Sequence, residues 1–224
     1  NNIKLRGLSL FANVGIAEAF LESIGVHMEV ANELLPERAK FYQDVYPTTH
    51  MICGDITDDN IRTAIIEESK AKNVNFVMAT PPCQGMSRVG KMQEFDVRNQ
   101  LIYYAVDVIK RLNPEYVLIE NVTTILKTKI TVDGKVMIIP EYLNMELSNN
   151  YVFNKETKVK AMDYSIPQMR LRNIYLLVRK DKNVVWEFPP KTQIVNLREA
   201  IGHLPPVDPE LREGMDLTLE KFPD

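Results

Sequence analysis

Cysteine is scarce in this sequence, with only two among 224 residues. Two cysteines cannot build the disulfide framework of a small secreted domain, so we expect a reducing, cytoplasmic compartment. No apolar run approaches the roughly 18 residues of a membrane span. No basic leader precedes an apolar stretch, so we expect no signal peptide either. The sequence therefore predicts a cytoplasmic protein that makes no contact with a membrane.

A surplus of basic residues is missing as well. Lys and Arg number 27 against 30 for Asp and Glu, which gives a net charge of −3. Composition alone therefore gives no sign of nucleic-acid binding. The 45% of apolar and 25% of charged residues are close to the averages for soluble globular proteins. These values exclude collagen-like, low-complexity and largely disordered chains.

Short apolar runs alternate with amphipathic stretches in the first half of the chain. Strands are predicted over residues 3–11, 26–33, 50–53, 75–79 and 116–119, and helices over residues 16–24, 36–46, 58–72 and 99–112. Such an alternation predicts an α/β fold, in which a doubly wound, mostly parallel sheet carries helices on both faces.

The second half of the chain has a different pattern. An Asp-Gly pair within residues 130–137 predicts a β-hairpin. Residues 151–161 and 173–179 are predicted as two strands, antiparallel at one edge of the sheet. The chain then becomes rich in proline, with a short helix predicted over residues 197–204. We therefore expect one domain over residues 1–188 and a connector over residues 189–224.

Open α/β sheets bind ligands outside the carboxyl ends of their strands, so the residues at those ends are the candidates for a site. Glu33 follows Gly15 by 18 residues, near the spacing of about 20 at which an acid meets a nucleoside ribose. Asp55, at the end of the next strand, could accept from an adenine amino group, with Ile56 against the ring. The glycine pattern of the first turn is poor, so an ordinary βα turn remains an equal alternative.

A cysteine and a glutamate follow two further strands. Cys83 comes after two prolines that stiffen its loop, and thiols are the most nucleophilic side chains at neutral pH. Cys53 is interpreted instead as a small buried hydrophobic residue. Glu120 ends the neighbouring strand, where a partly buried carboxyl can hold or donate a proton. A structural glutamate that caps the next turn is the alternative.

Three blocks of the sequence at residues 81–87, 120–122 and 168–172 read Pro-Pro-Cys-Gln-Gly-Met-Ser, Glu-Asn-Val and Gln-Met-Arg-Leu-Arg. In this order and at these separations, they resemble the signature blocks of the cytosine-C5 DNA methyltransferases. Further segments similar to the same family lie at residues 11–15, 33, 54–56, 98–101, 163–167 and 198–205. The resemblance covers nearly the whole chain.

The resemblance implies a role for each catalytic candidate. The Cys83 thiolate would add to C6 of a flipped-out cytosine, which makes C5 nucleophilic. Glu120 would bind the ring near N3. Arg172 and Arg170 would orient the base or its phosphates through their guanidinium donors.

S-adenosylmethionine is the cofactor that the resemblance implies, with no metal ion. The implied cofactor-binding residues are Phe11, Ala12, Asn13, Val14, Gly15, Glu33, Leu34, Asp55, Ile56, Pro82 and Leu101. The sequence departs from the family at the start of this set. Ser9 stands where the family has an acidic residue, and Asn13 and Ile16 replace glycines. Asn tolerates left-handed backbone angles, so we expect the turn to form.

Double-stranded DNA is the substrate that the resemblance implies, for a monomeric modification enzyme of a restriction-modification system. The family's target-recognition region is not found after Pro206. Two alternatives therefore stay open: a tRNA cytosine-C5 methyltransferase with the same chemistry, and a non-catalytic relative that binds nucleic acid or a partner protein. A small-molecule methyltransferase would leave Cys83 and the two arginines unexplained.

Overall fold

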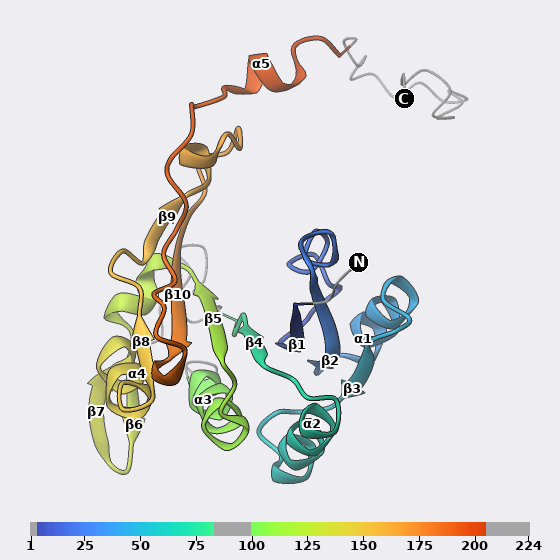
Figure 1. Ribbon diagram of the computed structural model, residues 1–224, viewed down its shortest axis with the longest axis vertical. Coiled ribbons are helices and arrows are strands. Elements are labelled where there is room, and N and C mark those ends of the chain that lie inside the picture. The colour runs from blue at the N-terminus through green and yellow to red at the C-terminus, as the bar shows by residue number, and fades with distance from the viewer. Residues whose placement is uncertain (1–3, 83–99, 205–224) are drawn as a thin grey trace, which may run out of the picture. The chain divides into compact units, whose positions relative to one another are not determined.

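The computed structural model describes residues 4–82 and 100–204 (Figure 1). Its contacts divide the chain into two compact units. The first consists of Asn1–Lys160 and Arg170–Pro190, and the second of Ala161–Met169 and Lys191–Asp224. The predicted boundary between residues 188 and 189 stays a prediction. No helix among the described residues is long and apolar enough to cross a membrane.

An eight-stranded sheet forms the centre of the first unit, with the strand order β3-β2-β1-β4-β5-β10-β8 and with β9 paired to β10. Its strands are β1 (Leu5–Leu10), β2 (Val26–Glu33), β3 (His50–Cys53), β4 (Phe76–Ala79), β5 (Tyr116–Asn121), β8 (Tyr151–Phe153), β9 (Lys158–Lys160) and β10 (Leu171–Arg179). The five strands β1 to β5 are parallel, whereas β10 runs antiparallel to β5 and to β8. The parallel strands therefore end together at one edge of the sheet.

Helices pack against both faces of this sheet (Figure 1). α2 (Asp59–Ala71), α3 (Leu101–Leu112) and α4 (Ile139–Leu147) share the main core with alternate strand residues such as Leu8, Val77 and Val117. α1 (Pro36–Val45) lies on the other face, where Tyr42 packs against Ala31. The predicted doubly wound α/β fold is confirmed. Fully buried apolar side chains from both layers stabilise it by removing apolar area from water.

The predicted hairpin is also confirmed. β6 (Lys129–Val132) pairs antiparallel with β7 (Lys135–Ile138). Asp133 and Gly134 connect them with φ values of 48° and 75°. Two positive φ values in a two-residue loop are what an Asp-Gly turn supplies, because its twist matches that of the strands.

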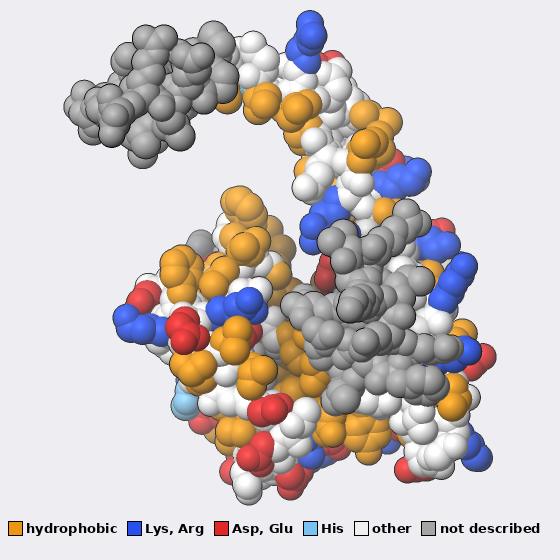
Figure 2. Space-filling view, turned by 180° about the vertical axis from the view of Figure 1, so that it is seen from behind, with side chains coloured by type: hydrophobic (Ala, Val, Ile, Leu, Met, Phe, Trp, Pro, Cys, Tyr) orange, Lys and Arg blue, Asp and Glu red, His pale blue; other side chains and the backbone are white. Residues whose placement is uncertain are grey.

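The helix predicted over residues 16–24 is wrong. This segment forms turns, and only Glu22–Ile24 is helical, as a 3-10 turn. Ile16, Phe20 and Ile24 recur at helical spacing, but their side chains are 80%, 83% and 66% exposed. Figure 2 shows hydrophobic side chains gathered on the surface at this segment. A helix draws most of its stability from packing its apolar face, and this stripe packs against no core among the described residues.

The strand predicted over residues 151–161 is broken in the middle. Its two ends form β8 and β9, and Asn154 lies between them. The Asn154 side chain donates to the carbonyl oxygens of Glu156 and Ile174 and accepts from the backbone amide of Leu176. These bonds replace the strand ladder at this point. The pairing of both short strands with β10 is antiparallel, as predicted.

Candidate functional site

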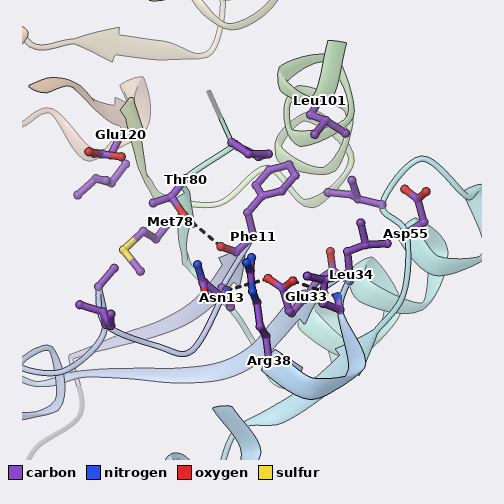
Figure 3. A pocket seen from close by; sticks show the side chains of 18 of the residues that line it. Phe11, Asn13, Glu33, Leu34, Arg38, Asp55, Met78, Thr80, Leu101 and Glu120 are labelled. Carbon is purple, nitrogen blue, oxygen red and sulfur yellow. Dashed lines mark hydrogen bonds between the residues drawn. The ribbon is translucent and has the colours of Figure 1, made fainter. Parts of the chain in front are cut away.

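A pocket of about 820 Å³ opens at the carboxyl ends of the parallel strands (Figure 3). It is lined by Phe11, Ala12, Asn13, Ile16, Ala17, Asn32, Glu33, Leu34, Leu35, Arg38, Gly54, Asp55, Ile56, Met78, Thr80, Pro82, Leu101, Leu118, Glu120, Arg170 and Ile174. All of these residues belong to the first unit. The place of the pocket agrees with the rule for open parallel sheets.

The pocket brings together most of the predicted site residues. Of the predicted cofactor residues, only Val14 and Gly15 do not line it, and the candidates Glu120 and Arg170 line the same cavity. Arg172 is connected to it through Glu120. Cys83 lies outside the described residues, although Pro82 beside it is in the wall. The roles of these residues stay predictions.

The turn after β1 has the left-handed backbone that its sequence allows. Phe11, Asn13 and Gly15 have φ values of 61°, 52° and 81°. Asn13 thus adopts the conformation expected of the glycine that it replaces, because Asn tolerates this region better than most residues. The amide of Ala12 donates to the carbonyl oxygen of Asn32 at 3.0 Å. This bond ties the turn to the end of β2.

Glu33 at the end of β2 is 6% exposed and fixes two backbone segments. Its Oε2 accepts from the amide of Asn13 at 2.8 Å, and its Oε1 accepts from the amide of Leu35 at 3.0 Å (Figure 3). Each carboxylate oxygen has a second lone pair, so both can still accept a further hydrogen bond. The carboxylate is therefore held in a fixed orientation on the pocket wall.

The adjoining wall follows β3. The Asn32 side chain donates to the carbonyl oxygens of Ile52 and Gly54, at 2.9 and 3.1 Å. Asp55 Oδ1 accepts from the amide of Thr57 at 2.9 Å, which closes a tight turn. Ile56 is 4% exposed and belongs to the main core. An apolar side chain and an anchored carboxylate thus both line the wall, and their role toward an adenine ring stays a prediction.

Glu120 on β5 and Arg172 on β10 form an ion pair between these two neighbouring strands. Ile174 stands opposite Glu120 in the antiparallel register, so Arg172 lies two residues further along the same face. Its Nε is 2.9 Å from Glu120 Oε1, and the two side chains are only 24% and 28% exposed. The Asn121 side chain donates to the carbonyl oxygen of Pro81 at 3.3 Å. This bond connects the end of β5 to Pro81, which precedes Cys83 in the sequence.

Some lining residues are absent from the sequence prediction. Thr80 follows β4, and its hydroxyl donates to the carbonyl oxygen of Phe11 at 3.3 Å. Its place directly after a buried strand was a signal that could have found it. Arg38 is exposed on α1 at the pocket wall, and no local pattern distinguishes it from a surface arginine. Cys53 is exposed, not buried as predicted, because β3 is an edge strand.

Replacing Gly15 by Ala is expected to lower the free energy of unfolding by about 2–4 kcal/mol. The residue has a φ of 81°, and an added Cβ would lie 2.2 Å from a ring carbon of Tyr46. The control is Gly134→Ala, where φ is also positive, at 75°, but no atom lies within 4 Å of the added Cβ. That variant should lose only the backbone contribution, about 1 kcal/mol. Urea unfolding compares the two, and equal losses would contradict the close packing of Gly15.

The fold and the pocket define a doubly wound α/β protein with a small-molecule-sized pocket at its strand ends. The family model for C-5 cytosine-specific DNA methylases matches residues 5–213. The chain belongs to this family, which confirms the resemblance seen in the sequence. S-adenosylmethionine-dependent methyl transfer is the chemistry of that family.

Individual relatives of the chain are also methyltransferases. The chain is 39% identical over 216 residues to the type II methyltransferase M1.HgaI of Avibacterium volantium, covering 94% of this chain and 60% of that protein. It is 29% identical over 213 residues to the type II methyltransferase M.XorII of Xanthomonas oryzae pv. oryzae, covering 92% and 48%. The chain thus spans about half the length of the curated relatives that it matches.

Solved structures show the same fold. A crystal structure from an E. coli prophage, described as a DNA modification methyltransferase, has a TM-score of 0.70 at 25% identity, covering 91% of this chain and 56% of that one. Spodoptera frugiperda DNMT2 has a TM-score of 0.61 at 21% identity, covering 86% and 54%. The second comparison concerns the fold alone.

Proposed function

We propose that this chain is the catalytic part of a DNA cytosine-C5 methyltransferase, the modification enzyme of a restriction-modification system. It would transfer a methyl group from S-adenosylmethionine to C5 of a flipped-out cytosine in duplex DNA, as a cytoplasmic monomer. The observation that carries the proposal is that Glu33, Asp55 and Glu120 line the same pocket. Glu120 also forms an ion pair with Arg172. Membership of the methylase family supports it.

The residues of the pocket fit a nucleoside cofactor. The volume of about 820 Å³ lies within the range of about 300–1,000 Å³ that is usual for small-molecule sites. Glu33 would accept from ribose hydroxyls, and Asp55 from an adenine amino group, with Ile56 and Leu101 as apolar walls. S-adenosylmethionine would supply an electrophilic methyl group when bound.

The chain's own residues supply the rest of the chemistry. A bond from the Cys83 Sγ to C6 would move electron density onto C5, which is a poor nucleophile in the aromatic ring. Glu120 would hold the ring near N3 and, by giving a proton to N3, offset the negative charge that develops there. Methyl transfer would leave S-adenosylhomocysteine, and loss of the C5 proton to water would then restore the C5–C6 double bond and release the Cys83 thiolate. Arg172 would keep the Glu120 carboxylate in place.

Transfer of label from tritiated S-adenosylmethionine by the full-length protein tests the proposal. We expect label in a random-sequence duplex DNA pool and none in tRNA, and calorimetry should detect binding of S-adenosylhomocysteine. Label in tRNA alone would replace the DNA substrate by the RNA substrate. Absence of both cofactor binding and label would favour the non-catalytic relative and contradict the proposal.

A further inference from the structure

Behind the turn that follows β1, two polar side chains are paired in the interior. Ser9 on β1 is 1% exposed, and Glu18 is 3% exposed. The Ser9 hydroxyl donates to Glu18 Oε1 at 2.5 Å. Glu18 Oε2 has no hydrogen-bond partner among the described residues. Glu18 is not in the pocket wall, so the mechanism above does not use it.

The Glu18 backbone continues directly into the cofactor turn. Its amide donates to the carbonyl oxygen of Gly15 at 3.3 Å, and the amide of Gly15 donates to the carbonyl oxygen of Ala12 at 3.0 Å. The Tyr46 hydroxyl donates to the same Gly15 oxygen at 2.6 Å. The Ser9–Glu18 bond therefore connects the C-terminal end of the turn to β1. Glu33 holds the N-terminal end of the turn through the amide of Asn13.

The groups that face Glu18 within the described part of the chain carry no positive charge. Ser9 reaches it from β1, and Tyr42 and Tyr46 from the α1 side. Burial raises the pKa of the Glu18 carboxyl above its usual 4.5. Burial and the nearby Glu18 also raise the pKa of both tyrosine hydroxyls, so these stay neutral. No described lysine, arginine or histidine forms an ion pair with Glu18, so its ionised form is not compensated there.

We propose that Glu18 is a positioning residue for the cofactor, which acts by fastening the 12–18 turn to Ser9 from behind the pocket. A carboxyl in this interior is costly compared with an apolar side chain, so stability alone does not account for it. The hydrogen bond to Ser9 gives the turn one fixed geometry, and with it the Phe11–Asn13 wall of the pocket. The inference rests on the proposed cofactor.

A pH dependence follows from the sign of the pKa shift. A carboxyl with a raised pKa in the folded turn favours the protonated form, so the turn is most stable at low pH. Its stability falls as the pH rises above 4.5 through the pKa of the folded protein. Cofactor affinity should fall over the same range, because binding requires the ordered turn.

Calorimetry with S-adenosylhomocysteine and the full-length protein tests the inference. Glu18→Ala should weaken binding by about tenfold or more, because it removes a buried hydrogen bond to Ser9. Glu18→Gln keeps that bond and does not ionise, so it should bind within about twofold of the unmodified protein at low pH. Its affinity should also lose the fall with rising pH. The control is Glu22→Ala on the same segment, whose side chain is 72% exposed and should leave binding unchanged.

Two outcomes would overturn the inference: Glu18→Ala binding as tightly as the unmodified protein, or Glu18→Gln keeping the same fall with pH. If Glu18→Ala does not fold, the pH profile of Glu18→Gln decides. If the unmodified protein binds no S-adenosylhomocysteine, the proposed function fails by itself. Amide hydrogen exchange without cofactor then tests Glu18, because its removal should speed exchange at residues 12–18 and removal of Glu22 should not.

Discussion

Replacing Cys83 by Ser is expected to lower the rate of methyl transfer by about 10⁴-fold or more, as removal of a catalytic nucleophile does in other enzymes. A hydroxyl ionises far less than a thiol at neutral pH and is a weaker nucleophile. Without the bond to C6, C5 of cytosine keeps its aromatic character and attacks no methyl donor. Initial rates with tritiated S-adenosylmethionine and duplex DNA measure this loss.

The same variant can be tested for the covalent bond. In a duplex containing 5-fluorocytosine, the fluorine cannot leave as a proton does, so the protein–DNA adduct should persist in denaturing gels. Cys83→Ser should give no adduct. The control is Cys53→Ser, because Cys53 is the other cysteine and is exposed at the end of β3. Equal labelling by Cys83→Ser and the unmodified protein would rule out the covalent mechanism.

Replacing Glu120 by Gln should lower the transfer rate by about 10²-fold and leave cofactor affinity within about twofold. The amide keeps the size of the side chain but cannot carry the negative charge that pairs with Arg172, 2.9 Å away. The amide also has no acidic proton to give to N3, where negative charge develops when the thiolate bonds to C6. Single-turnover rates and calorimetry separate the two effects.

The control for Glu120 is Glu115→Gln, just before the other end of β5. Glu115 pairs with Lys182 at 2.5 Å and does not line the pocket, so its loss should leave the transfer rate unchanged.

Arg172→Ala should slow transfer as well, and the double variant with Glu120→Gln should lose less than the sum of the two. Strict additivity would show that Arg172 does not act through Glu120.

Local pattern was enough to predict most of the sheet. Short apolar runs such as Val117-Leu118-Ile119 predicted their strands, because a run of this length is typical of a strand and too short for a helix. Helical spacing misled the prediction for residues 16–24, whose apolar side chains have no core to pack against among the described residues. It also gave no sign of α4, which is a short helix with a proline in its first turn.

The sequence predicted which residues of the candidate site follow the strands, but not how their side chains are arranged in space. Glu33, Asp55 and Glu120 follow strands along the chain, and parallel strands bring such ends together. The pairing of Glu120 with Arg172 depends on the register of β10 against β5, which links residues about 50 positions apart. No local pattern contains that register.

By itself, the sequence determined the α/β class, the residues at the strand ends and the family, because these depend on local periodicity and on short blocks of residue types. Only the tertiary structure decided which side chains meet. It paired Ser9 with Glu18, placed Arg172 on Glu120 and exposed Cys53 at a sheet edge. These contacts join distant segments, and the packing of the whole sheet sets them.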